Sequence, residues 1–448
     1  MLPSLYVQAL TETRFKGPIV RINVRELHIK DSQYYGNIYT GSSRRVNKDS
    51  ATVAAFPVTT AVAATVDHNI HRARRGYLNP YFSKRVVVDL EPLIHDRIGR
   101  LCARLEKAMQ QGQVTILDSA FSALAADIIT QRFYGEHFDY LGIQDFKFSV
   151  RETFIAAGLV YHFSRFFPSV VASLKSLPLP ILRWIAPGVA DIETVREQIK
   201  HNILTSLDEK RSTNSKSVIV SALADPNIPA KERTIDRLLD EGTTFIFAGT
   251  ETSARALSVT MFHLLNNKSN LRKLRDELDT LPPRQGNAYS LSQLEPLPYL
   301  TGVVNEGFRL SFGPVSRLPR VATHETLRYK DYLIPAGTPV SQSSYFVHTD
   351  PLIYPNPFSF EPTRWIKAAQ EGITLNKFLV SFTKGSRQCI GINMAYAELY
   401  LTIARIVRSF EMDLYETTPE DLEIYHVRLV GCPRKGGDVK VTVTGKIG

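Results

Sequence analysis

The sequence has few cysteines and no long uninterrupted hydrophobic run. Its 448 residues include only three cysteines, Cys102, Cys389 and Cys432. An odd number without zinc-like pair spacing argues against a disulfide framework or a structural zinc site, so we expect a reducing compartment. The most apolar region, residues 153–187, contains no charge-free piece longer than residues 153–164. A membrane-spanning helix needs roughly 18 to 20 apolar residues, so this region is expected in the core or at a surface.

The N-terminal stretch does not read as a secretory signal. Its short apolar run ends at Thr11 and Glu12, too early to span a bilayer. The formal net charge of +10 suits an acidic partner, an anionic membrane surface or nucleic acid. Arg72, Arg74 and Arg75 form a basic cluster, but aromatic residues are not interleaved at base-stacking spacing. We therefore expect no nucleic-acid partner.

Helical patterns dominate the chain, and strand patterns are short. The longest helical pattern covers residues 234–266 and contains no proline, so the helix would cross a whole domain. No internal repeat or linker is evident, which favours one mixed, mainly helical domain. In chain order, the pattern predicts strands within 17–30, helices over 93–109, 117–135 and 234–266, a small sheet within 324–341, an irregular meander over 350–365, a helix after Cys389 and a strand over 438–445.

The stretch FTKGSRQCIG, residues 382–391, places Cys389 just ahead of a helical pattern. A thiolate at a helix N-terminus is stabilised by free backbone N–H groups, and such a sulfur can bind iron. Gly385 would let the loop fold around the sulfur, Phe382 would shield it, and Arg387 would supply a cation for a buried carboxylate. The alternative is a core cysteine that happens to precede a helix. The spacing of the surrounding residues favours iron.

FTKGSRQCIG resembles the haem-binding signature Phe-x-x-Gly-x-Arg-x-Cys-x-Gly of the cytochrome P450 family at every specified position. The resemblance implies a mainly α fold with small β-sheets and a long central helix across a buried haem. It implies haem b, with Cys389 as the axial iron ligand. Because it covers nearly the whole chain, we expect residues 1–448 to form a single catalytic domain. The N-terminal membrane anchor usual in eukaryotic members is not visible in this chain.

Within the longest helical pattern, FAGTETS resembles the family's oxygen-binding motif. The resemblance implies that Glu251 and Thr252 deliver protons during oxygen activation while bulk water is excluded. Gly249 is expected to leave room there and to loosen the helix into a local bulge. Taken alone, the motif also fits an ordinary helix glycine beside a packing threonine.

Glu306 and Arg309 lie three residues apart, a spacing that lets them pair on one helical face. A lone Glu-x-x-Arg is common on solvated helices, where such a pair contributes little. Here Arg364, in FEPTRW, resembles the third member of the family's buried Glu-Arg-Arg network. The resemblance implies a structural role, in which the network holds the meander behind the haem.

The two haem propionates need cations if they are to be buried. His71 and Arg75 resemble the family's Trp-x-x-x-Arg element, with histidine in place of tryptophan. His71 can still donate a hydrogen bond, although its charge would depend on pH. Arg320 and Arg387 are the other candidates for contact with the propionates.

The resemblance also implies a substrate pocket lined by Phe245, Ala248, Val315 and Ser316, which favours a small apolar molecule. The same residue types also occur as plain core. The implied reaction inserts one oxygen atom from O2, with electrons from NADPH–cytochrome P450 reductase that docks near Lys384. The sequence is similar in style to fungal members that act on terpenoid or polyketide-like secondary metabolites.

Two other functions stay open on the sequence alone. One is a haem-thiolate isomerase or dehydratase that needs no reductase, and the other is a shortened haem-binding relative without activity. Glu251 and Thr252 favour the monooxygenase, because the isomerase has no need of proton delivery to dioxygen. By resemblance the protein is expected at the cytoplasmic face of the endoplasmic reticulum, with peripheral membrane contact through residues 153–187 and the positive charge.

Overall fold

The computed structural model describes residues 17–447, with internal gaps. The residues left undescribed inside that range are 55, 57, 136–137, 147–148, 165, 211–217, 219–220, 222–224, 283–287 and 434–436. The N-terminal stretch considered above, residues 1–16, therefore lies outside the described part.

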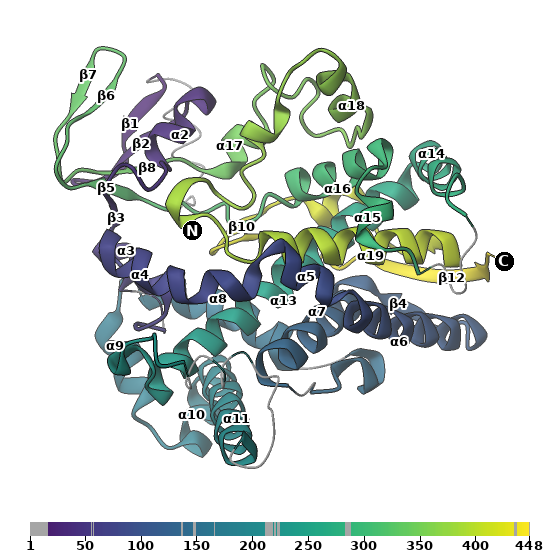
Figure 1. Cartoon of the computed structure of the whole chain (residues 1–448), viewed down its shortest axis with the longest axis horizontal. Coiled ribbons are helices and arrows are strands. Elements are labelled where there is room, and N and C mark those ends of the chain that lie inside the picture. Colours follow the sequence, from purple (N-terminus) through teal and green to yellow (C-terminus); the bar gives the residue numbers. More distant parts are fainter. Residues whose placement is uncertain are drawn as a thin grey trace.

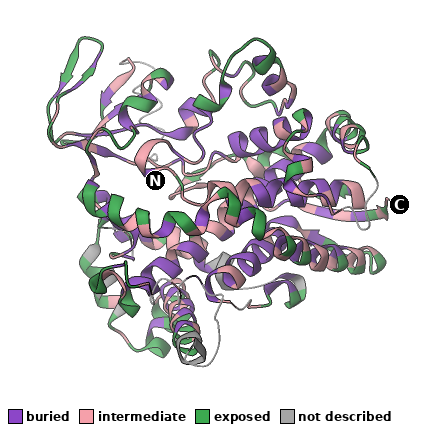
Figure 2. Ribbon diagram, in the orientation of Figure 1, coloured by how far each residue is buried: buried purple, intermediate pink, exposed green. Residues whose placement is uncertain are grey.

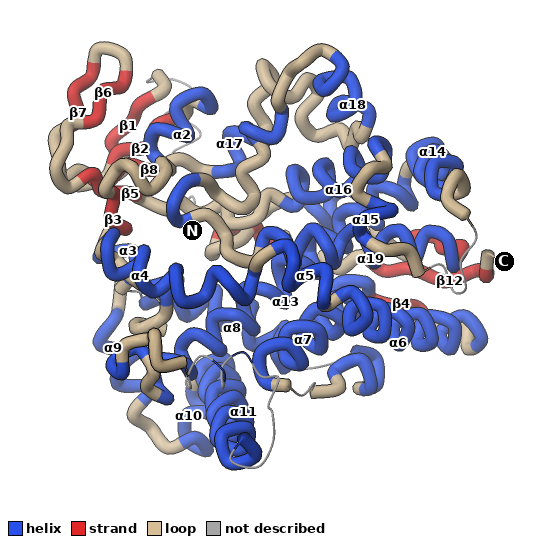
Figure 3. Tube along the Cα trace, viewed as in Figure 1, coloured by secondary structure: helices blue, strands red, loops and turns tan. Residues whose placement is uncertain are grey.

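Helices make up most of the structure, as Figure 3 shows, and α13 (Ile235–Asn266) passes through its middle. This 32-residue helix begins at Thr234, whose side chain accepts a hydrogen bond from the backbone N–H of Arg237. It packs against α7 (Leu117–Tyr134), α16 (Pro298–Ser311) and α19 (Ile392–Ser409). The predicted long helix is confirmed, and its buried faces form the centre of the core (Figure 2).

The strands form small sheets, two of them at the upper left and one at the right of Figure 1, while β10 lies nearer the middle. One sheet has the order β1-β2-β8-β5-β3, and a separate hairpin pairs β6 with β7. A second sheet has the order β4-β12-β9, and β10 pairs with β11. The strands expected near both ends of the chain and within 324–341 are confirmed. Their bounds are β1 Ile19–Arg21, β2 Leu27–Ile29, β3 Val46–Lys48, β4 Val114–Ile116, β5 Arg320–Ala322, β6 Leu327–Tyr329, β7 Tyr332–Ile334, β8 Pro339–Ser341, β9 Phe410–Leu414, β10 His426–Val427, β11 Gly431–Cys432 and β12 Lys440–Lys446.

The other helices surround the central group formed by α7, α13, α16 and α19. The predicted helix over 93–109 is α6, and α7 ends at Gly135 with φ of 82°, a left-handed cap that suits glycine. The remaining bounds are α2 Tyr35–Ile38, α3 Ser50–Val53, α4 His68–Leu78, α5 Lys84–Asp89, α6 Glu91–Gln110, α8 Ser149–Ser164, α9 Pro168–Lys175, α10 Leu179–Ile185, α11 Pro187–Lys210, α14 Lys268–Leu278, α15 Leu291–Leu294, α17 Ser344–His348 and α18 Thr363–Gln370.

The apolar region 153–187 forms most of α8 and all of α9 and α10, at the lower left of Figure 1. Several of its large apolar side chains are exposed, and Trp184 reaches 86% relative exposure. Figure 2 shows green, exposed ribbon over α9 and α10. Across the described residues, no helix combines the length and the hydrophobicity that a bilayer span requires. The surface alternative therefore holds for much of this region.

Candidate active site

The loop before α19 takes a tight shape that only glycine allows at position 385. Gly385 has φ of 75°, and a Cβ there would lie 2.0 Å from the carbonyl oxygen of Thr40. The backbone N–H of Ser386 donates to the same oxygen at 2.9 Å, and the N–H of Cys389 donates to the carbonyl of Phe382 at 2.9 Å. The loop is thus held to the segment around Thr40 and closed on itself.

The Cys389 thiol lies just before α19, and its environment has opposing effects on its pKa. Its side chain is accessible, yet surrounding protein atoms desolvate the sulfur and raise the pKa of the thiol. A hydrogen bond from the backbone N–H of Gly391 and the charge of Arg75 act in the opposite direction on that pKa. The ring of Phe382 packs edge-on against Phe308, with centroids 4.8 Å apart. The Gly391 N–H and the Arg75 charge thus both favour the thiolate form of the Cys389 sulfur.

Four predicted cofactor residues lie close enough to perturb one another electrostatically. Burial is the largest cause that lowers the pKa of His71 to about 2, and the charges of Arg387, Arg75 and Arg320 contribute to the same shift. Burial, then repulsion from Arg320, lowers the pKa of Arg387 to about 9. In the protein without a bound anion this low pKa favours the neutral imidazole, and the pH dependence of the His71 charge with haem bound stays a prediction.

Lys48, at the end of β3, belongs to the same group, which we call the cation cluster: Lys48, His71, Arg75, Arg320 and Arg387. Burial and the charges of Arg320 and Arg387 lower the pKa of Lys48 well below its usual value. Sequence reasoning missed Lys48, because one lysine at a strand end belongs to no recognisable motif. Only the pairing of β3 with β5 brings it beside Arg320, its partner in the strand register.

Among the described residues, the side chains of the cation cluster bond mainly to backbone carbonyls, although the charges of Asp67 and Glu241 act on Arg387 and Lys48. Arg387 donates to the carbonyls of Thr65 and Val66 at 2.5 and 2.7 Å, and its buried Nε atom has no hydrogen-bond partner among the described residues. Arg75 donates to the carbonyl of Gln388. Clustered cations in a partly buried site require a compensating anion. A haem, whose two propionates are anionic, fits this arrangement beside the Cys389 sulfur.

On α13, the residues predicted for oxygen activation, Glu251 and Thr252, are neighbours in the sequence, and each side chain has a hydrogen-bond partner. The hydroxyl of Thr252 donates to the Ala248 carbonyl at 2.6 Å, and the Glu251 carboxylate accepts from the Ser122 hydroxyl at 3.1 Å. The predicted bulge is wrong, since α13 is regular α-helix through this stretch. Gly249 is instead required by packing, because a Cβ there would lie 2.1 Å from Cδ1 of Ile129 on α7. The glycine lets the two helices approach.

A cavity of about 610 Å³ adjoins this face of α13. Ala248, Glu251 and Thr252 line it together with the basic residue Lys48 of the cation cluster. Most of the other lining is apolar. It includes Phe56, Val58, Ala63, Phe154, Ala157, Tyr161, Phe247, Pro314, Leu318, Leu429 and Val430.

The structure does not bring three predicted pocket residues to this lining. Phe245 is buried among aromatic rings, with its centroid 4.5 Å from that of Phe133 and 5.2 Å from that of Phe82. Its ring is packed between Phe82 and the α7 residue Phe133, which keeps it out of the lining although Ala248, three positions further along α13, belongs to it. Val315 is buried, and the Ser316 backbone N–H is bonded to the carbonyl of Leu429 at 3.2 Å.

Nearby residues line the cavity in place of Phe245, Val315 and Ser316. Phe247 lines the cavity from α13, and Pro314 and Leu318 line it from the loop after α16. The sequence pattern located the correct segments, but the helical turn and the loop path decide which side chains face the cavity.

Glu306, Arg309 and Arg364 form a buried ion-pair network. The Arg309 Nε donates to Glu306 at 2.6 Å, and the Arg364 Nε donates to its other carboxylate oxygen. Burial raises the pKa of Glu306, and both guanidinium groups oppose that shift. The arginines also donate to the carbonyls of His348, Pro355, Pro357 and Ser359. The network therefore holds the meander predicted over 350–365.

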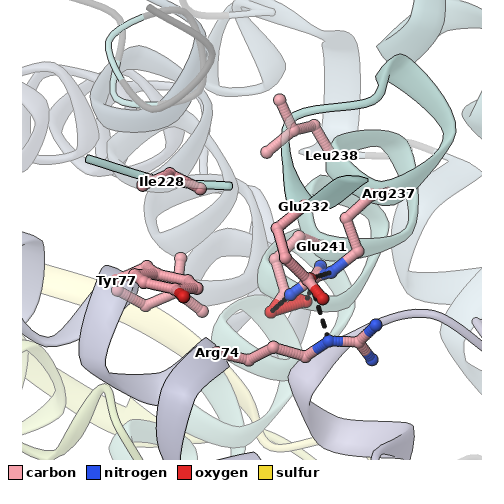
Figure 4. Close-up of a pocket in the computed structure, with 8 residues that line it drawn as sticks. Arg74, Tyr77, Ile228, Glu232, Arg237, Leu238 and Glu241 are labelled. Atoms are coloured by element: carbon pink, nitrogen blue, oxygen red, sulfur yellow. Dashed lines mark hydrogen bonds and ion pairs between the residues drawn. The ribbon is translucent and has the colours of Figure 1, made fainter. Parts of the chain in front are cut away.

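A second ion-pair network joins α4 to the start of α13 (Figure 4). Arg74 donates to Glu232 at 2.9 Å, and Arg237 contacts both Glu232 and Glu241. Glu241 in turn accepts from the backbone N–H of Val62 at 2.9 Å. Arg74 therefore forms an ion pair inside the protein, and a hydrogen bond holds the segment around Val62 against α13 near the cavity.

Comparison with known proteins identifies the chain. The sequence profile described as Cytochrome P450 matches residues 17–441. The chain is 56% identical to cytochrome P450 monooxygenase TRI4 of Trichoderma arundinaceum over 96% of this chain and 85% of that protein. It is 54% identical to cytochrome P450 monooxygenase SAT11 of Stachybotrys chartarum over 96% and 83%, and 49% identical to cytochrome P450 monooxygenase astB of Aspergillus terreus over 96% and 85%. The chain belongs to the cytochrome P450 family.

The prediction of family, mainly helical fold and reaction type is therefore confirmed. The protein is a cytochrome P450 monooxygenase, an oxidoreductase with a haem-thiolate cofactor. Its reaction uses O2, a small-molecule substrate and a redox partner.

Proposed function

We propose that residues 1–448 act as a single catalytic domain in which Cys389 supplies the thiolate ligand of a haem b iron. The proposal rests mainly on the conformation of the loop around Cys389. Gly385 allows its close turn, and the N–H of Gly391 and the charge of Arg75 favour the thiolate. When bound, the haem supplies the iron at which dioxygen is activated. The remaining chemistry belongs to the residues around it.

The cation cluster holds the two propionates. Arg75, Arg320 and Arg387 are charged donors, and Lys48 adds a fourth cation from β3. His71, held neutral by burial, contributes a hydrogen bond in place of the usual tryptophan. This assignment brings anionic groups to cations whose hydrogen bonds within the described residues go mainly to backbone carbonyls.

Glu251 and Thr252 deliver protons from the α13 side of the cavity. The Thr252 hydroxyl is anchored by the Ala248 carbonyl, and the Glu251 carboxylate is oriented by Ser122. An acid and an alcohol at successive positions can pass protons inward while the apolar lining limits bulk water. Ala248 and the apolar residues of the lining position a small apolar substrate.

The redox partner is NADPH–cytochrome P450 reductase, which docks on the basic surface around Lys384. The exposed apolar side chains of α9 and α10 make peripheral membrane contact at the cytoplasmic face of the endoplasmic reticulum. The pathway is fungal secondary metabolism with a terpenoid or polyketide-like substrate. One relative, 42% identical over 96% of this chain, is named conidiogenone synthase, from Penicillium rubens.

The decisive experiment is the carbon monoxide difference spectrum of the reduced holoenzyme. We expect the strongly red-shifted Soret band of a thiolate-bound haem, and its loss in Cys389→Ala. Cys102→Ala is the matched control, because this buried cysteine lies on α6 and should leave the band unchanged. A band that survived in Cys389→Ala would disprove the assignment.

A second experiment tests proton delivery. Thr252→Ala should retain the spectrum but divert electrons from product to hydrogen peroxide, while Thr252→Ser, which keeps the hydroxyl, should stay coupled. The ratio of product to NADPH consumed measures the effect. Equal coupling in Thr252→Ala and the unmodified enzyme would remove Thr252 from the proton path.

A further inference from the structure

One end of the cavity is polar, and a C-terminal hairpin forms part of it. Strands β10 and β11 bring Arg428, Leu429 and Val430 to the lining. Two contacts fix this hairpin to the loop after α16: the Ser316 N–H donates to the Leu429 carbonyl, and Pro314 forms a bridge with Val430. The position of Arg428 is therefore set by backbone pairing.

The other charged groups at this end have protein partners. Asp118 accepts from the backbone N–H of Val439 at 2.8 Å and lies 3.4 Å from Arg255. Arg255 also donates to the carbonyls of Gly437 and Leu422, at 3.3 and 3.4 Å. These contacts tie helices α7 and α13 to the C-terminal segment, so they are structural.

Arg428 differs from them. Within the described residues its guanidinium group makes no hydrogen bond or ion pair, although the residue is half-buried. Its stem lies against α8, with its Cβ 3.6 Å from the point that a Cβ on Gly158 would occupy. Its charge acts on Cys432, another lining residue, and lowers the pKa of that thiol against the effect of burial.

We infer that Arg428 binds an acceptor oxygen of the substrate, a carbonyl or carboxylate on an otherwise apolar molecule. A guanidinium group beside apolar walls gains most from such an oxygen, because a charge-assisted hydrogen bond there competes with little water. The substrate would then be held at two ends, with its apolar body along α13 and its oxygen at the hairpin. This inference rests on the proposed function, and it makes Arg428 a specificity-determining residue.

Three sesquiterpenoid probes test it in the holoenzyme: valencene, a hydrocarbon; nootkatone, the ketone with the same skeleton; and valerenic acid, a carboxylic acid. Dissociation constants come from the substrate-induced Soret shift and, independently, from equilibrium dialysis. Arg428→Gln should weaken the binding of at least one oxygenated probe about tenfold or more and leave valencene binding unchanged. The probe with the larger loss identifies the preferred oxygen.

Arg328→Gln is the matched control, since this exposed arginine lies on the β6–β7 hairpin, outside the cavity lining. It should change no dissociation constant. If Arg428→Gln fails to unfold cooperatively, Arg428→Lys replaces it, with an expected loss of about threefold or more because lysine lacks the planar fork.

Equal affinity of the variant and the unmodified enzyme for both oxygenated probes would overturn the inference, as would an equal loss for valencene. Failure of the proposed function looks different. A missing red-shifted band would show it, whereas the dialysis measurement decides the role of Arg428 without reference to that band.

Discussion

Two groups of buried charge in this protein make opposite use of arginine. In the Glu306 network, two guanidinium groups meet one carboxylate and several carbonyl oxygens, all from the chain itself. In the cation cluster, Lys48, Arg75, Arg320 and Arg387 lower one another's pKa or that of His71, and their protein contacts are mainly carbonyls.

This contrast distinguishes charged residues that stabilise the fold, the Glu306 network, from charged residues that we propose bind a ligand, the cation cluster. A buried ion pair balanced within the chain holds two segments together whether or not a ligand is bound. The cations of the cation cluster outnumber the described carboxylates that act on them, Asp67 and Glu241, so they repel one another and are expected to gain stability when an anion binds. The following predictions test this distinction, in order of expected effect.

Glu306→Gln should have the largest effect, because it removes the buried counter-charge of Arg309 and leaves Arg364 with only the partly exposed Glu361. We expect a loss of about 3–5 kcal/mol in the free energy of unfolding, measured by urea denaturation. Glu361→Gln is the control: Glu361 also pairs with Arg364, at 3.4 Å, but is 41% exposed, so about 1 kcal/mol or less is expected. Similar losses for both variants would contradict a special role for the buried pair.

Gly385→Ala tests the loop that carries Arg387 of the cation cluster together with Cys389. Gly337→Ala is matched to it, because Gly337 has φ of 83° but no atom within 4 Å of an added Cβ. Both variants carry the backbone cost of a positive φ, and only Gly385→Ala adds the collision with Thr40. We expect Gly385→Ala to be less stable by about 1–3 kcal/mol and to retain less haem. Equal thermal unfolding midpoints would disprove this account.

Lys48→Met should separate haem binding from protein stability. Without haem, the variant should be as stable as the unmodified protein or more so, because repulsion from Arg320 and Arg387 is relieved. With haem, its transfer to apomyoglobin should be about tenfold faster, the loss expected for one ion pair of about 1.4 kcal/mol. Reduced stability of the haem-free variant with unchanged haem transfer would place Lys48 among the structural charges instead.

Replacing Glu398, on α19, should change the free energy of unfolding by an amount that depends on pH. Burial raises the pKa of this carboxyl to about 8, opposed by a hydrogen bond with Ser253. Between the ordinary value near 4.5 and about 8, the folded protein binds more protons than the unfolded chain, so stability falls as pH rises. Glu398→Gln should be more stabilising at pH 8 than at pH 5, by about 1 kcal/mol or more. A pH-independent difference would disprove the shift.

The site divides into parts that the sequence predicted and parts that it did not. The Cys389 loop, the pairing of Glu306 with Arg309 and the long α13 helix follow from short-range spacing, and the structure contains all three. Phe245 and the bulge at Gly249 were predicted wrongly, because both depend on how α13 meets α7. Periodicity gives a helix its faces but does not say which neighbour covers each face.

By itself, the sequence determined the family, the loop around Cys389 and the neighbouring positions of Glu251 and Thr252, since each depends on residues a few positions apart. Only the tertiary structure decided that Lys48 joins Arg320 and Arg387, and that Arg428 packs against α8 and lines the cavity. The physical reason is that these contacts join strands and helices far apart in the chain. Their positions depend on sheet register and helix packing, which local spacing does not encode.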